Sequence, residues 1–391
     1  MSRSHSAAQA LQLARELACE FATRAAAADA HAQLPAADVA ALRSAGFFAL
    51  SVPRALGGSG LPMAACLAVQ IELAQGSAAT AMVLGMPLHI FGSASEHCPW
   101  LPNAFENLCQ LAADGALVNA VASEPELGSP SRGGLPQSTL HAHTAGGYTL
   151  NGLKTWTTGG RHLTHMLVRV RHAEVPAIAL VETARAGVEW DETWGNALSL
   201  RASDSHDVRF NNVHLPAENL IQPDCSAPGA PPNAWFPVMM AAVYLGSALA
   251  ARNAVIQFAL ERTPTALGAP IATLPKIQRQ IGALDVRLMS ARTLLEAVVE
   301  KWDGSAAAQR ELYPRIVAAK YLVSEVANEV TDAALRIAGG TSITRTLPLE
   351  RHFRDVRAGL MQPPSGDTAL ELIGRSALAE GGATASPPRA G

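Results

Sequence analysis

The chain has 391 residues, 49% of them hydrophobic and 16% charged, with a formal net charge of −3. This length suits two or three packed domains, and the composition excludes disordered and fibrous classes. Because the chain has no broad positive charge, we do not expect nucleic acid as a partner.

No apolar run in the sequence reaches the roughly 18–20 residues of a membrane span, so we expect no membrane association. Residues 1–6 lack the hydrophobic core of a signal peptide. The cysteines number 5, and they are scattered without CxxC spacing. This pattern indicates a reduced, cytoplasmic compartment and predicts no zinc or other metal site.

The first part of the chain is predicted to be helical. Residues 8–28 are rich in Ala, Leu, Glu and Arg, which are good helix formers. Pro35 fits the opening of a second helix that runs to Ser44. A Gly-rich loop follows at 50–61, and residues 62–115 carry further helices interrupted by prolines.

From about Ala116 the hydrophobic period changes to that of strands. We predict strands at 116–122, 166–171, 178–181 and 208–215, the last ending at Pro216. The Asn151-Gly152 pair predicts a hairpin turn, followed by a strand over 154–158.

The remainder is predicted to be helical again after a Pro-rich connector at 222–233. Apolar residues recur at three- or four-residue spacing, as in a helix bundle. The helical patterns cover 235–262, 274–302, 306–338 and 367–380, before a loose tail at 381–391.

Three motifs occur in an informative order. They are Ala-Ser-Glu-Pro-Glu-Leu-Gly-Ser at 122–129, Asn-Gly-Leu-Lys-Thr-Trp-Thr-Thr-Gly at 151–159, and Leu-Arg-Ala-Ser-Asp at 200–204. Together they resemble the flavin-binding middle domain of the acyl-CoA dehydrogenase superfamily. The resemblance implies an α+β fold with a helical domain at 1–115, a β-domain at 116–221 and a four-helix bundle at 234–380.

The resemblance also implies a bound flavin, FAD or alternatively FMN. Ser123 would meet the pyrimidine side of the ring, Thr158 would bond N5, and Trp156 would pack against the ring system. Ser129 would reach the pyrophosphate, and the backbone of Ala122 would touch the ring. Ordinary turn and strand chemistry is the alternative role for the hydroxyl residues.

In this superfamily a neighbouring subunit completes the flavin site, so we expect a homodimer or homotetramer. Arg262, Arg336, Gly339 and Gly340 match the positions that reach across, and Ser365 is a further cofactor contact. A simple helix C-cap is the alternative role for the two glycines.

The usual catalytic base is missing from both positions where the superfamily carries it. The glutamate of the C-terminal segment falls on Pro363, and the position of a second branch falls on Phe236. Asp367 is the nearest carboxylate in sequence, with helix N-capping as its alternative role. His352 could assist, although we expect it to be a surface residue.

Three functions remain open at this stage. The first is α,β-dehydrogenation of an acyl thioester on CoA or a carrier protein, with an unconventional base and an electron-transfer partner. The second is a two-component monooxygenase, supplied with reduced flavin by a separate reductase, that acts on a small molecule. The third is a flavin- or acyl-binding protein without catalysis.

Overall fold

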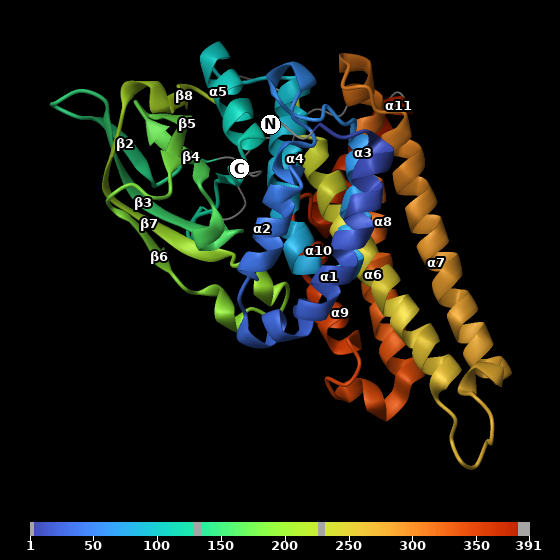
Figure 1. Cartoon of the computed structure of the whole chain (residues 1–391). Coiled ribbons are helices and arrows are strands. Elements are labelled where there is room, and N and C mark those ends of the chain that lie inside the picture. Colours follow the sequence, from blue (N-terminus) through green and yellow to red (C-terminus); the bar gives the residue numbers. More distant parts are fainter. Residues whose placement is uncertain (1–3, 128–133, 226–230, 382–391) are drawn as a thin grey trace.

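The computed structural model describes residues 4–127, 134–225 and 231–381. It confirms the predicted α+β fold: a twisted sheet lies on one side of the molecule and long helices lie on the other (Figure 1). The helices are α1 (Ala7–His31), α2 (Ala36–Ser44), α3 (Met63–Gly76), α4 (Ala78–Glu96), α5 (Pro102–Ala113), α6 (Trp235–Glu261), α7 (Pro275–Glu300), α8 (Ala306–Ala338), α9 (Leu349–Asp355), α10 (Ala358–Met361) and α11 (Gly366–Glu380).

Helix ends follow local chemistry. Ser6 caps α1, and Gln9 completes a reciprocal capping box. Pro275 occupies the first turn of α7, where a missing N–H is harmless. Ser305 accepts from the backbone of Ala308 at the start of α8. The starts of α1 and α8 therefore coincide with serine caps, and that of α7 with a proline.

Two helices correct the expectation that no segment has the length and composition of a membrane span. Both α4 and α6 are long and apolar enough to cross a membrane. However, 89% of the apolar window of α4 and 67% of that of α6 are buried inside the protein. Burial of this kind is usual for core helices, so the two segments are weak evidence for a membrane span.

The β part forms one eight-stranded sheet in the order β6-β7-β3-β2-β4-β5-β8, with β1 paired in parallel to β4. Its strands are β1 (Val118–Val121), β2 (Thr139–Ala142), β3 (Tyr148–Thr157), β4 (His165–His172), β5 (Val175–Glu182), β6 (Val188–Asp191), β7 (His206–Leu215) and β8 (Leu220–Gln222). The expectation that the last strand ends at Pro216 is wrong, because β8 follows and pairs with β5.

The predicted hairpin turn at Asn151-Gly152 is also wrong. β3 runs straight through this pair, and the turn that reverses the chain lies between β2 and β3, at residues 143–147. Opposite the pair, β7 carries an extra residue, and Asn212 adopts a φ of 51° there. The side chain of Asn151 accepts from Asn212 N at 2.8 Å. A Cβ on Gly152 would lie 2.3 Å from Ser138 Oγ, so the glycine permits a close approach beside a bulge.

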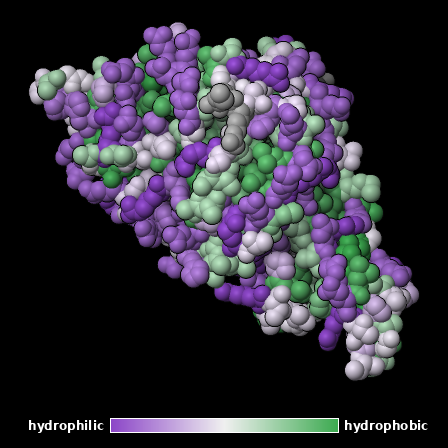
Figure 2. All heavy atoms as spheres, viewed as in Figure 1, coloured by the Kyte–Doolittle hydropathy of each residue, from purple (hydrophilic) through white to green (hydrophobic). Residues whose placement is uncertain are grey.

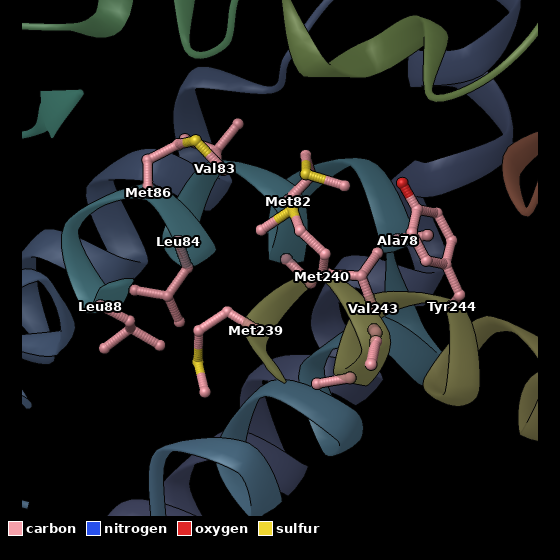
Figure 3. Packing of buried hydrophobic residues seen from close by; sticks show 14 of the residues in the cluster. Ala78, Met82, Val83, Leu84, Met86, Leu88, Met239, Met240, Val243 and Tyr244 are labelled. Carbon is pink, nitrogen blue, oxygen red and sulfur yellow. The ribbon is translucent and has the colours of Figure 1, made fainter. Parts of the chain in front are cut away.

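One large hydrophobic cluster contains residues of the N-terminal helices, the sheet and the C-terminal bundle. On the face seen in Figure 2, hydrophilic residues cover most of the sheet side, and the hydrophobic colour gathers over the helices. Figure 3 shows part of this cluster, where Met82 of α4 lies beside Met240 of α6. Flexible methionine side chains fill irregular space well.

Candidate active site

A buried ion pair holds the segment after β1 against β3. Lys154 Nζ donates to Glu124 Oε1 at 2.6 Å, and both side chains are almost completely buried. The Glu124 carboxylate also accepts from Ser138 Oγ at 2.7 Å and from Gln137 N at 2.7 Å. These contacts explain why a glutamate and a lysine occur in the two separate motifs.

The charge state of this pair follows from its surroundings. Burial acts to raise the pKa of Glu124, but the hydrogen bonds from Lys154 and Gln137 outweigh it and lower that pKa. Burial lowers the pKa of Lys154 to about 8, and the bond to Glu124 limits the fall. Both groups are therefore charged at neutral pH.

Trp156 is turned out of β3 by a bulge. Between Lys154 and Thr157 the pairing with β7 is interrupted, and Trp156 has a φ of 59°. A bulky residue with positive φ is uncommon and often marks a functional position. The indole is 62% exposed and borders an open cavity of about 370 Å³, with Trp194 and Asp207 also lining it.

Thr158 directly follows the same strand and lies in a chain of hydroxyl groups. Its Oγ1 is 2.9 Å from Ser205 Oγ, which is 2.8 Å from Ser203 Oγ. The carbonyl of Thr158 accepts from Asn119 Nδ2 at 2.9 Å. The hydroxyl is thus fixed in place. Ser203 belongs to the third sequence motif, whereas Ser205 lies outside it and was not predicted as a site residue.

The remaining β-domain candidates lie on the segment after β1. The Ser123 carbonyl accepts from Thr155 N at 3.0 Å, which brings this segment beside Trp156. Ala122 and Ser123 are half-buried. Ser129 lies outside the described residues. The structure therefore brings Ala122, Ser123, Trp156 and Thr158 into one region.

These residues fit a flat ring system with polar edges. The exposed indole offers an apolar wall to the open cavity beside it. Thr158, two residues further along the chain than Trp156, does not line that cavity, but its hydroxyl, held 2.9 Å from Ser205 Oγ, can donate or accept a hydrogen bond. Trp156 and Thr158 would hold such a ring, with Ser123 at its edge.

The candidates expected to serve a neighbouring subunit lie away from this region. Arg262 is the C-cap of α6, and the C-terminal end of that helix lies far from the sheet (Figure 1). Arg336, in the last turn of α8, is exposed and pairs with Asp332 at 2.8 Å. Gly339 follows as the C-cap with a φ of 63°, and it begins a short 3-10 helix that also contains Gly340. Within one chain they do not meet the Trp156 cavity.

The two base positions carry no group that accepts a proton. Pro363 lies in the loop between α10 and α11. Phe236, at the start of α6, contacts the ring of His89, with centroids 5.0 Å apart. Burial lowers the pKa of His89 to about 3, so this imidazole is neutral and a weak base.

Two expectations about nearby polar residues are corrected. Asp367 is not the N-cap of α11; Ser365 holds that position, and its Oγ lies 3.1 Å from Thr368 Oγ1. Asp367 is exposed in the first turn, where the helix dipole favours a negative charge. His352 is not a surface residue: it is 3% exposed, and its Nδ1 lies 3.0 Å from Ser247 Oγ. Burial lowers its pKa to about 3.

The fold and this region define a flavin-dependent oxidoreductase. Three family models match in order: the acyl-CoA dehydrogenase N-terminal domain at 5–106, middle domain at 119–213 and C-terminal domain at 238–361. The chain belongs to the acyl-CoA dehydrogenase family.

Individual relatives agree with this assignment. The putative acyl-CoA dehydrogenase YdbM of Bacillus subtilis (strain 168) is 35% identical, covering 93% of this chain and 94% of the relative. A structure of KijD3 in complex with FMN and dTDP-3-amino-2,3,6-trideoxy-4-keto-3-methyl-D-glucose is 25% identical, with a TM-score of 0.78 over 95% of this chain and 94% of that one. Butyryl-CoA dehydrogenase from Megasphaera elsdenii, at 21% identity, shares the fold with a TM-score of 0.84 over 97% of this chain and 100% of that one.

Proposed function

We propose that this chain oxidises an acyl thioester by oxygenation, using reduced flavin delivered by a separate reductase. The observation that carries the proposal is the identity of the two base positions, which are Pro363 and Phe236. A pyrrolidine or phenyl ring cannot accept the α-proton that dehydrogenation removes. Oxygenation needs no base at these positions. The full-length likeness to an acyl-CoA dehydrogenase supports the thioester as substrate.

Among the residues that the structure describes, no group near Pro363 or Phe236 replaces the missing base. His89, beside Phe236, has a pKa lowered to about 3 by burial. Asp367 is exposed at the start of α11. Both observations weigh against removal of the α-proton by a protein base, the step that dehydrogenation requires.

The reaction balances with two co-reactants, reduced flavin and molecular oxygen. Reduced flavin, when bound, supplies two electrons to molecular oxygen, so that one oxygen atom enters the substrate and the other leaves as water. The chain itself binds and orients: Trp156 provides the wall, and Thr158, fixed by Ser205, provides a polar contact.

The deciding experiment uses the flavin-loaded protein and octanoyl-CoA. Under anaerobic conditions we expect the oxidised flavin to keep its colour. After photoreduction and mixing with oxygen, we expect a product heavier by one oxygen atom. Rapid anaerobic bleaching, without an oxygenated product in the second arm, would contradict the proposal.

Dehydrogenation of the same substrate is the second candidate. The observation in its favour is the 35% identity to a putative acyl-CoA dehydrogenase. It requires a carboxylate elsewhere, and Asp367 is the candidate by nearness in sequence. Asp367→Asn should then abolish flavin reduction and leave flavin binding intact. An undiminished rate would remove Asp367 from consideration.

We further propose a cytoplasmic homo-oligomer in which Arg262, Arg336 and the pair Gly339-Gly340 reach the flavin of a neighbouring subunit. Their position away from their own Trp156 cavity supports this arrangement. Light scattering at micromolar concentration, with flavin present, should give a dimer or tetramer. A monomer would refute this part of the proposal.

A further inference from the structure

The loop that carries Pro363 is held from beneath by one buried lysine. Lys320, on α8, is 1% exposed. Its Nζ donates to the carbonyl oxygens of Gly359 at 2.8 Å, Gln362 at 2.7 Å and Pro364 at 3.0 Å. An ammonium group has three hydrogens, so all of its donors are used. The path of residues 359–364 is therefore fixed by contacts to its main chain.

This loop has few hydrogen-bond donors that could contact a ligand. Pro363 and Pro364 have no N–H, and the N–H of Gln362 donates to Ala358 O at 3.0 Å. The carbonyls of Gln362 and Pro364 accept from Lys320. Within 362–364, the side-chain amide of Gln362 is the one remaining donor.

The orientation of that amide is set by two neighbours. Tyr244 Oη donates to Gln362 Oε1 at 2.5 Å, and Gln362 Nε2 lies 3.8 Å from Met82 Sδ. A thioether sulfur can only accept, and weakly, so the amide nitrogen faces Met82 and the oxygen faces Tyr244. Figure 3 shows Tyr244 and Met82 on the facing helices α6 and α4.

The tyrosine is itself fixed by close packing. It is fully buried, and burial raises the pKa of its hydroxyl well above the usual value, so it remains a donor. A Cβ on Gly359 would lie 2.8 Å from Tyr244 Cδ2, so only glycine allows the loop to approach this ring. Gln362, in contrast, is half-buried and accessible.

We propose that Gln362 determines substrate specificity by donating its amide N–H to the carbonyl oxygen of the acyl thioester, and that Lys320 and Tyr244 are the residues that position it. The inference rests on the proposed function, since it takes the thioester as substrate. It adds a donor at the loop that lacks the base. Because the present acceptor of this amide is only a sulfur atom, an oxygen acceptor would replace it favourably.

The test compares two ligands on the flavin-loaded protein. Octanoyl-CoA has the thioester carbonyl, whereas S-octyl-CoA has a methylene group in its place. For the wild type we expect octanoyl-CoA to bind about three- to tenfold more tightly, the effect of one neutral hydrogen bond. Gln362→Leu should weaken octanoyl-CoA alone and bring the two dissociation constants together.

Separate substitutions test the two positioning residues, Tyr244 and Lys320. Tyr244→Phe keeps the ring against Gly359 and should lose part of the preference, with a smaller fall in melting temperature than Lys320→Met. Lys320→Met should lose most of the preference and also lower the melting temperature, whereas the exposed Lys276→Met should change neither. If Lys320→Met does not fold, Tyr244→Phe still tests the arrangement.

Three results would overturn the inference: equal binding of the two ligands by the wild type, an unchanged preference in Gln362→Leu, or no binding of either ligand. Oxygen incorporation is measured separately. If the carbonyl preference depends on Gln362 but no oxygenated product forms, oxygenation fails and the role of Gln362 stands. If product forms and the preference is absent, only the role of Gln362 fails.

Discussion

Replacing Lys154 by methionine tests how Trp156, the proposed apolar contact of the flavin, is held in place. The substitution removes the ammonium that donates to Glu124 at 2.6 Å and leaves a carboxylate buried without its charged partner. Breaking a buried ion pair by removing one partner destabilises a protein by about 3–5 kcal/mol. Glu124 retains donors from Ser138 and Gln137, so we expect a loss of about 3 kcal/mol, at the lower end of that range.

The same change should weaken flavin binding, because Thr155 N donates to the Ser123 carbonyl one residue before Trp156. Urea unfolding, followed by tryptophan fluorescence, measures the free energy of unfolding, and flavin titration measures the dissociation constant. The double variant Glu124→Gln/Lys154→Met should lose less stability than Lys154→Met alone, since a neutral amide is less costly to bury.

A loss below about 1 kcal/mol for Lys154→Met would show that the pair does not hold this region. A double variant less stable than Lys154→Met would contradict the argument that the unpaired charge is responsible. Normal flavin affinity in a destabilised Lys154→Met would separate the ion pair from the orientation of Trp156.

Three further changes test other parts of the structure. Trp156→Ala should weaken FMN or FAD binding by about tenfold with little change in melting temperature, because the indole is 62% exposed; equal affinity would exclude it from the flavin wall. Gly246→Ala should destabilise by about 1–3 kcal/mol in urea unfolding, because its Cβ would lie 2.5 Å from Ile71 O. Burial raises the pKa of Asp355 to about 7 in the folded state, so its contribution to stability should fall as pH rises from about 4 to about 7; Asp355→Asn should flatten that profile.

Much of the fold could be predicted because it follows from local sequence signals. The predicted helix at 306–338 coincides with α8, and Pro35 does precede α2. The hairpin at Asn151-Gly152 was wrong because this pair is typical of a turn only when both residues have positive φ. Here Asn151 pairs with Thr139 of β2, Gly152 pairs with Phe210 of β7, and the glycine makes room for Ser138, a contact that a short sequence window does not contain.

The candidate site could be predicted only in part, for a related reason. The motifs indicated Trp156 and Thr158, but the groups that fix their surroundings come from distant positions, such as Ser205 for Thr158. His352 was expected at the surface because its charged neighbour Arg351 suggested solvent, yet its ring packs under α6 beside Ser247. Burial of a polar side chain depends on tertiary packing, which periodicity alone does not specify.

The proposed flavin contact and the proposed substrate loop are each supported by a buried lysine. Lys154 holds the segment beside Trp156, and Lys320 holds the loop with Pro363. On the loop, Lys320 bonds to the main chain and does not depend on the side chain at position 363. A carboxylate could therefore be placed at that position with the three bonds of Lys320 retained.

Pro363→Glu tests this conclusion and the location of the substrate together. If the acyl thioester lies against this loop, the new carboxylate supplies a general base, which typically contributes about 10²–10⁴-fold to the rate. We expect octanoyl-CoA to bleach the oxidised flavin anaerobically in Pro363→Glu and not in the matched variant Pro364→Glu. A folded, flavin-bound Pro363→Glu that remains inert would show that the thioester does not bind at this loop. Because the substitution also restores a backbone N–H at this position, a gain in octanoyl-CoA affinity without bleaching would indicate a new hydrogen bond in place of a base.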